Sequence, residues 1–329
     1  MKELFYKDFM VGLTQRVMAQ IAKVTPPTIS KCIAQNDIKP VDIKNLRNMR
    51  YDINDVRKVL RHCIGKDLKI HKPVMAFYNF KGGVGKTSIC FQISSHLAMM
   101  GFKVLVVDAD PQGHLTTSFG LSNEHEYLTL YDIIEHQMSP KEVIQPIFEG
   151  LDLVPSNLSL TRIEVSLNEL PKREERIKIA FDPLKQDYDF ILFDTNPSIS
   201  HLNRNVIVFS DLLNIIVETQ AYSINGLKLL MNDLDRFFQS MVMQKPEIFI
   251  IPNRYEDRTS TSVEAITLLR EFYGEYMIEN FAFRKSEDIN ISAKTSQPLA
   301  VFCRKNSIAL EDVLDVLYYI LFKTTDLEL

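Results

Sequence analysis

Residues Lys81-Gly82-Gly83-Val84-Gly85-Lys86-Thr87 decide the fold of this 329-residue chain. Glycines at this spacing let backbone N–H groups close around phosphate oxygens, while a lysine meets the terminal phosphates and a Ser or Thr hydroxyl ligates Mg²⁺. The last two residues of the stretch supply that lysine and that hydroxyl. The stretch therefore predicts a phosphate-binding loop, and Lys81 adds a second cation at its entrance.

The flanking residues have the pattern that such a loop requires. Residues 74–78 form a short apolar run that is typical of a buried parallel strand. After the loop, apolar residues recur at helical spacing until Gly101, at Ile89, Ile93, Leu97 and Met100. A helix that begins at the loop directs its N-terminus toward bound phosphates. The order strand, glycine loop, helix predicts a nucleotide site.

Composition narrows the class of protein. Apolar residues make up 46% of the chain, which is enough for a large core, and 329 residues allow one large domain or two unequal ones. No run approaches the ~18 uninterrupted apolar residues of a membrane span, and the first residues do not resemble a secretory signal. The four cysteines form no CxxC pair, at Cys32, Cys63, Cys90 and Cys303. We therefore expect a cytoplasmic protein with reduced thiols and no membrane partner.

Charge is distributed unevenly along the chain. Residues 1–72 contain 15 Lys and Arg against 7 Asp and Glu, a net charge of +8, whereas the rest of the chain has a net charge of −12. Such asymmetry favours a basic nucleic-acid-binding module joined to an acidic domain, although a lysine-rich segment can also be an ordinary solvated surface. The basic connector at residues 65–72 predicts a boundary between domains 1–72 and 73–329.

The pattern over residues 13–33 predicts two short helices around a tight turn. Thr25 is the expected N-cap of the second helix and Pro26 its first residue. That helix should bury Ile29, Ile33 and Ala34 and expose Thr28, Ser30, Lys31 and Gln35. A further capped helix should begin within residues 50–57. The arrangement resembles the winged helix-turn-helix of MerR-like DNA-binding domains, which makes Thr28, Ser30 and Lys31 candidate base contacts. A small helical dimerisation module is the alternative.

Strand patterns recur beyond the loop and alternate with helical ones, notably at residues 224–238 and 262–272. The further predicted strands are at residues 103–107, 189–193, 213–217 and 247–251. This alternation predicts an α/β fold with a doubly wound, mainly parallel sheet, whose ligands bind at the carboxyl ends of the strands. Acidic residues follow three of these strands, at Asp108, Asp194 and Glu218. A single carboxylate there could be a helix cap instead, but several beside a phosphate loop favour a metal and nucleotide site.

Together, three motifs resemble those of ParA-type partition ATPases, whose phosphate loop carries the additional lysine. They are the loop at 81–87, the sequence Asp-Ala-Asp-Pro-Gln-Gly at 108–113 and the run Phe-Ile-Leu-Phe-Asp at 190–194. Segments 130–134, 151–157 and 284–287 are similar as well, so the resemblance covers about residues 73–320. Asn196 departs from the family, which usually has proline there, so the loop that follows is expected to differ.

The resemblance implies ATP or ADP and Mg²⁺ as ligands. The loop residues Gly82, Gly83, Val84, Gly85, Lys86, Thr87 and Ser88 would hold the phosphates, and Asn253 matches the adenine-contacting position. Thr87, Asp108 and Asp194 would serve the metal, since Walker-B carboxylates hold the Mg²⁺ shell. Asp110 matches the residue that orients the attacking water, and Lys86 neutralises phosphate charge. By resemblance, Lys81 reaches across a homodimer to the nucleotide of the partner, as an arginine finger does.

The resemblance also implies a partition function in a prokaryotic, nucleoid-associated protein. An ATP-bound dimer would bind nucleoid DNA non-specifically, through Arg284, Lys285 and nearby cations at Lys294, Arg304 and Lys305. A centromere-binding ParB-like adaptor would stimulate slow hydrolysis, which resets the dimer and moves plasmid or chromosome cargo. The larger plasmid ParA proteins also repress their own operon through an N-terminal domain. Each cation other than Arg284 could instead be part of an unspecialised surface.

Three rival functions remain to be compared. A nucleotide-responsive transcriptional repressor fits the N-terminal pattern and could coexist with partition activity. A membrane-positioning ATPase of the MinD type should end in a basic amphipathic helix, whereas residues 309–322 carry three acidic residues and an apolar face typical of core packing, formed by Leu310, Val313, Leu314, Leu317 and Ile320. An iron–sulfur reductase would need paired cluster cysteines, which the sequence lacks.

Overall fold

The computed structural model describes residues 12–41, 49–122, 126–220, 222–303 and 307–327. In this part of the chain, seven strands form one sheet in the order β3-β4-β2-β5-β1-β6-β7. The strands are β1 (Val74–Tyr78), β2 (Val104–Ala109), β3 (Gln145–Phe148), β4 (Leu151–Val154), β5 (Phe190–Thr195), β6 (Leu212–Glu218) and β7 (Glu247–Asn253). All neighbouring pairs are parallel except β3 with β4. The predicted α/β fold with a mainly parallel sheet is confirmed.

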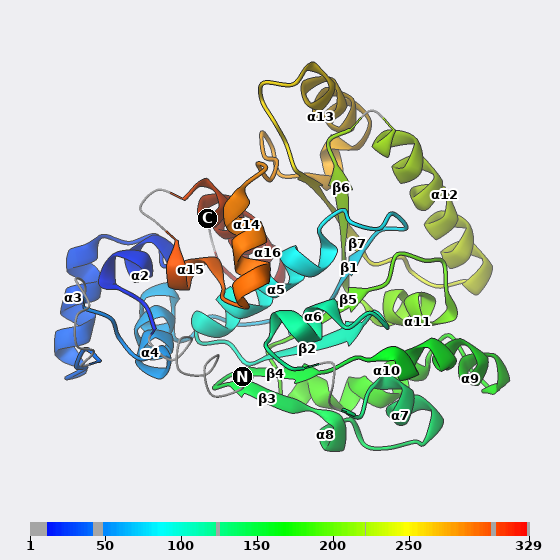
Figure 1. The fold of residues 1–329 in the computed structure, drawn as a ribbon, viewed down its shortest axis with the longest axis horizontal. Helices are drawn as coiled ribbons and strands as arrows, with labels where there is room; N and C mark the ends of the chain where they lie inside the picture. Colours follow the sequence, from blue (N-terminus) through cyan, green and yellow to red (C-terminus); the bar gives the residue numbers. More distant parts are fainter. Residues whose placement is uncertain (1–11, 42–48, 123–125, 221, 304–306, 328–329) are drawn as a thin grey trace.

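Helices cover both faces of this sheet (Figure 1). Those of the N-terminal third are α2 (Gln15–Ile21), α3 (Pro26–Gln35), α4 (Ile53–Ile64), α5 (Lys86–Met99) and α6 (His114–Ser118). The middle of the chain forms α7 (Leu130–Glu135), α8 (Pro140–Val143), α9 (Ile163–Glu169), α10 (Arg176–Phe181), α11 (His201–Phe209) and α12 (Ser223–Met241). The last are α13 (Ser260–Tyr273), α14 (Glu287–Thr295), α15 (Leu299–Phe302) and α16 (Ile308–Thr324). Short 3₁₀ turns lie at Leu158–Arg162, Asp182–Gln186 and Gly274–Tyr276.

Each central strand is apolar on both faces, because helices pack on both sides of a parallel sheet. In β1, Met75 and Phe77 belong to the core on the side of α5 and α16, whereas Val74, Ala76 and Tyr78 belong to the core on the side of α11 and α12. Figure 1 shows these two helix layers with the sheet between them. The C-terminal helix α16 lies in the first layer, and its five predicted core residues are buried. No helix among the described residues has the length and apolarity needed to cross a membrane.

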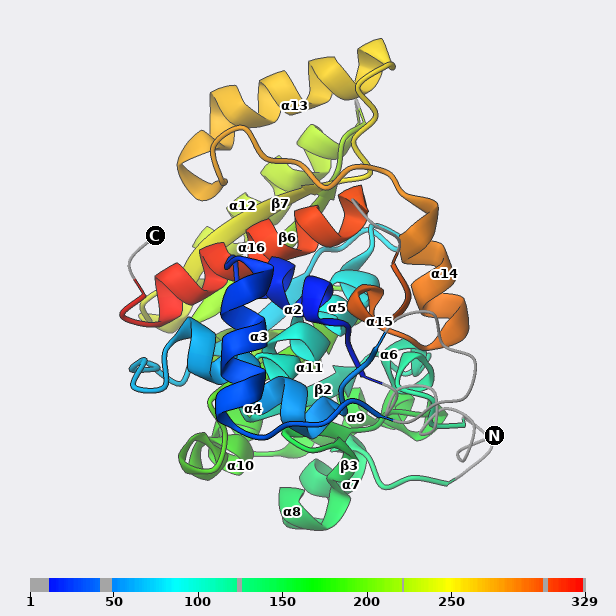
Figure 2. The ribbon, with the colours of Figure 1, turned by 90° about the vertical axis from the view of Figure 1, so that its left-hand side faces the viewer.

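The N-terminal helices α2 to α4 pack against α5 and α16 (Figure 2), and their apolar residues are continuous with the core beneath the sheet. The Tyr318 hydroxyl of α16 donates to the carbonyl oxygen of Ile21 at 2.9 Å. Arg57 of α4 is buried and donates from Nη1 to the carbonyl oxygens of Ala98 and Phe102, the latter at 3.2 Å. The guanidinium therefore caps the carboxyl end of α5, the helix that begins at the phosphate loop.

Within α3, the predicted start is confirmed, with Thr25 as N-cap and Pro26 as the first residue. Ile29 and Ile33 are buried as expected, but the prediction for Ala34 is wrong because its side chain is exposed. Cys32 takes the third buried position, since it lies three residues after Ile29 on the face that packs toward α4. The helix predicted near residues 50–57 is α4, capped by Asp52. Part of the basic segment before it, residues 42–48, lies outside the described residues.

Candidate nucleotide and metal site

The phosphate loop connects β1 to α5 at the carboxyl edge of the sheet. Gly83 and Gly85 have positive φ angles of 75° and 100°, which glycine adopts without strain. A Cβ atom on Gly85 would lie 2.4 Å from Nδ2 of Asn253, so a side chain at this position would displace its neighbour. Backbone conformation and close packing both require glycine here. The first turn of α5 consequently points its N–H groups into the space beside the loop.

The space beside the loop is a cavity of about 830 Å³. It is large enough for a nucleotide. Its lining combines the loop with the ends of β2 and β5 and with the segment before α11. The residues are Gly82, Gly83, Gly85, Lys86, Thr87, Ser88, Asp110, Pro111, Gln112, His114, Ser118, Leu160, Thr161, Ile163, Glu164, Asn196, Pro197, Ser198, Ser200, Leu202, Arg254 and Ala293. Most of the predicted phosphate-binding residues and Asp110 are thus brought together.

Thr87, which lines the cavity, lies in contact with Asp194, which sits at the end of β5. The Thr87 hydroxyl donates to Oδ2 of Asp194 at 2.6 Å, and Asp194 is fully buried at the end of β5. The other carboxylate oxygen, Oδ1, has no hydrogen-bond partner among the described residues. A buried carboxylate oxygen without a partner is unfavourable unless a cation or water satisfies it. These two side chains fit Mg²⁺, which takes few protein ligands and completes its shell with water and phosphate oxygens.

Charges in this cluster perturb one another. Burial, followed by repulsion from Asp108, raises the pKa of Asp194 well above its ordinary value. Burial lowers the pKa of the Lys86 ammonium, while Asp194 and Asp110 oppose that change. Asp108 and Asp194 are paired across β2 and β5, which explains their mutual repulsion. Such a concentration of buried, opposing charges beside a cavity is typical of a functional site.

Asp108 is bonded entirely within the protein. Its Oδ1 accepts from the backbone N–H of Asp110 at 3.1 Å, and its Oδ2 accepts from the N–H and hydroxyl of Thr116 at 2.8 and 2.7 Å. Burial raises the pKa of Asp108 to about 6 against these hydrogen bonds. The carboxylate therefore holds the turn between β2 and α6, which carries Asp110, and its metal role stays a prediction. Asp110 itself accepts from the N–H of Gln112 at 2.9 Å.

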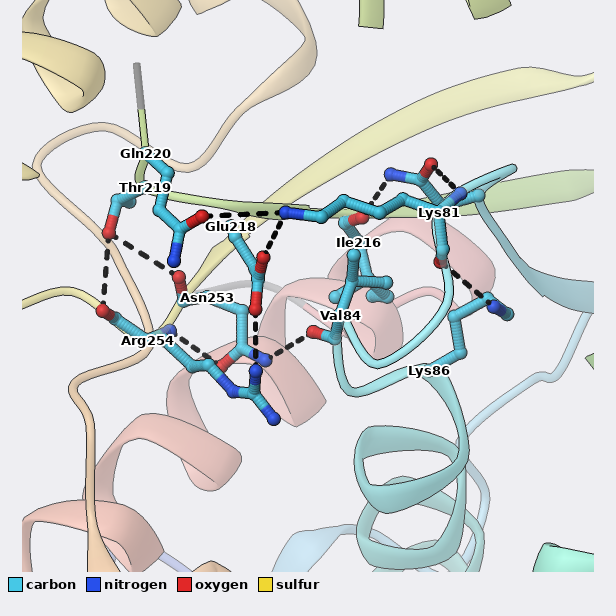
Figure 3. Close-up of polar contacts among 10 residues, drawn as sticks. Lys81, Val84, Lys86, Ile216, Glu218, Thr219, Gln220, Asn253 and Arg254 are labelled. Carbon is cyan, nitrogen blue, oxygen red and sulfur yellow. Dashed lines mark hydrogen bonds and ion pairs between the residues drawn. The ribbon is translucent and has the colours of Figure 1, made fainter. Parts of the chain in front are cut away.

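Lys81 and Lys86 extend in opposite directions from the loop (Figure 3). The buried Lys86 ammonium stays beneath the loop, 3.5 Å from the carbonyl oxygen of Lys81. The Lys81 ammonium instead reaches Oε2 of Glu218, at the end of β6, and lies 3.4 Å from Oε1 of Gln220. Oε1 of Glu218 accepts from Nη1 of Arg254 at 2.5 Å. One buried carboxylate thus binds two cations.

Asn253 supports the loop from the end of β7. Its Nδ2 donates to the carbonyl oxygen of Val84 at 2.7 Å, and its Oδ1 accepts from the N–H of Arg254 at 2.8 Å. The predicted adenine contact stays a prediction, since in this structure both side-chain atoms bond to the protein.

Asn196, the departure from the family motif, is bound into the turn that precedes α11. Its Oδ1 accepts from Nδ2 of Asn203 at 3.0 Å and from the hydroxyl of Ser198. Its Nδ2 lies 3.5 Å from the carbonyl oxygen of Ala109, at the end of β2. The amide therefore joins this turn to the neighbouring strand end, and the Asp194 carboxylate two residues earlier accepts from the Thr87 hydroxyl.

Arg284 and Lys285, two of the predicted DNA-binding residues, are not among the residues that line the nucleotide cavity. Arg284 contacts the buried carboxylate of Asp312, with Nη2 2.5 Å from Oδ1. This ion pair and its hydrogen bonds raise the pKa of Arg284. Lys285 is more exposed and lies 2.9 Å from Oε1 of Glu256. Arg284 and Lys285 line a second cavity of about 620 Å³, together with Tyr255, Glu256, Asp257, Arg258 and Ile308.

The three candidate base contacts on α3 are exposed, as predicted. The Ser30 hydroxyl donates to Oε1 of Gln15 at 2.9 Å, and the hydroxyls of Thr25 and Thr28 lie 3.0 Å apart. Base contact by Thr28, Ser30 and Lys31 stays a prediction. Arg304 and Lys305, which are predicted to bind nucleoid DNA together with Arg284 and Lys285, lie outside the described residues.

Sequence reasoning missed Arg254 as a cavity-lining cation and Glu218 as its partner. Glu218 carried a signal, because it follows an apolar strand pattern on the edge where ligands bind. Arg254 carried none, because it takes a positive φ of 58° just after β7, a turn that no local pattern in the sequence indicates.

With this geometry in place, comparison with known proteins identifies the family. Residues 72–248 match the family model described as an AAA domain. The chain belongs to this family. It is 30% identical to the sporulation initiation inhibitor protein Soj of Bacillus subtilis over 201 residues, covering 61% of this chain and 79% of Soj. It is 28% identical to the chromosome partitioning protein ParA of Caulobacter vibrioides over 205 residues, covering 61% and 77% of the two chains. These matches support the resemblance to ParA-type partition ATPases.

Two further comparisons define how far the similarity extends. The chain is 32% identical to the cell division protein PomZ of Myxococcus xanthus over 203 residues, which is 61% of this chain and 64% of PomZ, so it spans less than two thirds of that relative. A crystal structure of cobyrinic acid a,c-diamide synthase from Mycobacterium smegmatis with bound ATP analogue and magnesium superposes with a TM-score of 0.66 at 23% identity, covering 76% and 94% of the two chains. At that identity the likeness shows the fold.

Proposed function

We propose that this chain is a Mg²⁺-dependent ATPase of the DNA-partition type, which alternates between an ATP-bound dimer and a reset state. The observation that carries the proposal is the meeting of Lys86, Thr87 and Asp194 beneath a phosphate loop that has a second lysine on its outer side. ATP or ADP with Mg²⁺ fits this site, as the ATP analogue and magnesium in the synthase structure suggest. Among the functions that share the fold, the similarity to the chromosome partitioning protein ParA points to partition.

Each residue of the site has a defined task in this proposal. The loop N–H groups and Lys86 bind phosphate oxygens and neutralise their charge. Thr87 and Asp194 hold the metal, which supplies further charge neutralisation on the terminal phosphates when bound. Asp110 orients the attacking water, and Asp108 holds the turn that positions Asp110. Hydrolysis is slow in a single chain because the Lys81 ammonium is bound to Glu218, away from this cavity.

DNA binding and partner recognition complete the proposal. The ATP-bound homodimer binds nucleoid DNA through phosphate contacts, for which the exposed Lys285 and Lys294 are suitable cations. Arg284 acts mainly by holding this segment in place through Asp312. A ParB-like centromere-binding adaptor stimulates hydrolysis, and cycles of binding and release move plasmid or chromosome cargo in the cytoplasm.

The N-terminal helices support a second, compatible activity, which is repression of the operon of the protein. The exposed polar side of α3 has the size and chemistry of a major-groove reader, and the packing of α4 on the carboxyl end of α5 joins it to the nucleotide domain. A repressor in which nucleotide is only an effector is the alternative function that this packing favours.

Substitution of the water-orienting carboxylate separates the two functions. Asp110→Ala should preserve ATP binding and operator binding, abolish hydrolysis, and cause loss of a test plasmid from dividing cells. Plasmid retention, a reporter fused to the operon, and phosphate release would be measured in parallel. Retention of the plasmid without hydrolysis, together with lost repression, would show that the chain is a repressor and not a partition ATPase.

A further inference from the structure

The Lys81 ammonium is bound within its own chain by a buried carboxylate. It donates to Oε2 of Glu218, and this contact spans from the phosphate loop to the end of β6 (Figure 3). The Lys81 side chain is 49% exposed, whereas the Glu218 side chain is only 6% exposed. If Lys81 serves the nucleotide of a second copy, as the resemblance to ParA-type ATPases implies, Glu218 and the phosphates of that nucleotide compete for the charge of the same ammonium group.

The backbone of Lys81 is held in place, so its side chain can leave Glu218 without a change in the loop. The backbone N–H of Lys81 donates to Oδ1 of Asn79 at 2.9 Å, and Nδ2 of Asn79 donates to the carbonyl oxygen of Ile216 at 2.6 Å. Ile216 and Glu218 both belong to β6. The backbone of Lys81 is therefore connected through Asn79 to β6, the strand that also carries the Glu218 carboxylate. Release of the ammonium requires only rotation of the half-exposed Lys81 side chain.

A second cation makes this release possible at moderate cost. Oε1 of Glu218 accepts from Nη1 of Arg254 at 2.5 Å, so each carboxylate oxygen has its own cation. When Lys81 leaves, Glu218 remains paired with Arg254. A buried carboxylate without any partner would be strongly unfavourable, which would hold Lys81 in place permanently. The pairing of one acid with two bases instead allows two states of the lysine.

We propose that Glu218 is an autoinhibitory latch that retains Lys81 in its own subunit until the nucleotide phosphates of a second copy compete for it. This inference rests on the proposed ATP-dependent dimer and adds its regulation. Only molecules with a released Lys81 can dimerise. The apparent dimer affinity is therefore lower when the fraction of molecules with a released Lys81 is smaller. Glu218 thus acts as a positioning residue and sets the ATP and protein concentrations at which dimers form.

The variant Glu218→Gln tests the latch, because glutamine keeps the shape of the side chain and can accept from Arg254 but lacks the charge that holds Lys81. With saturating Mg–ATP, we expect the dimer dissociation constant from sedimentation to fall by about fivefold or more. The matched control is Glu256→Gln, which removes the same charge from the exposed ion pair with Lys285. This control should leave the dimer constant unchanged. An unchanged or higher dissociation constant in folded Glu218→Gln overturns the proposal, as does an equal decrease in both variants.

A measurement on the nucleotide-free chain separates the latch from the proposed function. Acylation of lysines by an amine-reactive ester, followed by mass spectrometry, reports how freely each ammonium moves. Glu218→Gln should increase the labelling rate of Lys81 several-fold and leave that of Lys86 unchanged; equal Lys81 rates in both proteins would refute the latch. If Glu218→Gln fails to fold, Glu218→Asp, whose shorter side chain cannot reach both cations, should give the same changes. Absence of ATP-dependent dimers in the unmodified chain would contradict the proposed function instead.

Discussion

The Thr87 hydroxyl donates a hydrogen bond of 2.6 Å to Oδ2 of Asp194, which joins the first turn of α5 to the end of β5. The contact places a hydroxyl and a carboxylate side by side while Oδ1 of Asp194 keeps no partner among the described residues. This arrangement favours a cation between the protein and a bound phosphate chain.

Removal of this hydroxyl should impair the use of Mg²⁺. We expect Thr87→Val, which keeps the volume of the side chain, to lower Mg²⁺ affinity in the presence of ATP by about 10–100-fold. Thr87→Ser retains the hydroxyl, so its Mg²⁺ affinity should be close to that of the unmodified protein. The measurement is phosphate release as a function of Mg²⁺ concentration at fixed ATP. Equal Mg²⁺ dependence in both variants would exclude Thr87 as a ligand.

The buried Asp194 carboxylate should destabilise the nucleotide-free fold at neutral pH. Because burial and Asp108 raise its pKa, the folded chain retains a proton that the unfolded chain releases near pH 3.8. Stability from this group is therefore complete below that pH and is lost as pH rises through the folded-state pKa. Asp194→Asn cannot ionise, so it should be more stable than the unmodified chain by about 1–2 kcal/mol at pH 7, although it loses hydrolysis.

Urea unfolding without nucleotide or Mg²⁺ measures this difference, which should shrink as pH approaches 4. Asp108, whose pKa is raised to about 6, remains in both proteins, but the loss of repulsion from Asp194 makes its ionisation less unfavourable and adds to the stability gain of Asp194→Asn at pH 7. An Asp194→Asn chain that is less stable at both pH values would contradict the account.

Arg57 should be essential for the docking of the N-terminal helices. Its replacement by alanine leaves the carbonyl oxygens of Ala98 and Phe102 without their charged donor, so we expect a loss of about 2–3 kcal/mol in the free energy of unfolding. Lys58→Ala on the same helix, where the side chain is 68% exposed, should change stability by less than about 0.5 kcal/mol. Denaturant unfolding followed by circular dichroism measures both. Equal effects of the two substitutions would show that the cap is unimportant.

Substitutions of Arg284 and Lys285 should have different effects, the first on the stability of the fold and the second on DNA binding. Arg284→Ala leaves the Asp312 carboxylate, whose side chain is 4% exposed, without its main cation and should destabilise the fold by about 3–5 kcal/mol. Lys285→Ala should leave stability nearly unchanged. In a plot of the logarithm of the DNA-binding constant against the logarithm of salt concentration, it should reduce the slope by about one unit per subunit. Fluorescence anisotropy with arbitrary duplex DNA at several salt concentrations provides the test. An unaltered salt slope in Lys285→Ala would remove this lysine from the DNA surface.

Much of the fold was predictable because local patterns and tertiary structure agree along the central strands. The apolar run at residues 74–78 and the glycine loop after it specify β1, the loop and α5 without distant information. The antiparallel pair of β3 and β4 was not predicted, because four-residue strands at a sheet edge carry little apolar periodicity. Ala34 was misplaced because a small apolar residue fits either side of a helix, so packing against α4 decided the matter.

Candidate site residues were predictable where they belong to a local sequence motif. Contacts between segments that are distant in the sequence were not. Lys86, Thr87 and Asp194 come from motifs whose spacing encodes their tasks. The contact of Lys81 with Glu218 joins residues 137 positions apart. Arg57 caps α5 through backbone carbonyl oxygens, which every residue has and which therefore leave no signal in the sequence. Side-chain partners of this kind follow only from the packed structure.

Sedimentation of the full chain with and without Mg–ATP, compared with Lys81→Ala, tests the central claim most directly. The ATP-dependent dimer switch predicts that the unmodified chain becomes dimeric with Mg–ATP, and that Lys81→Ala binds the nucleotide with similar affinity yet remains monomeric, because its own cavity keeps Lys86 and Thr87. Lys81→Ala dimers that form with Mg–ATP as readily as those of the unmodified chain would contradict the account.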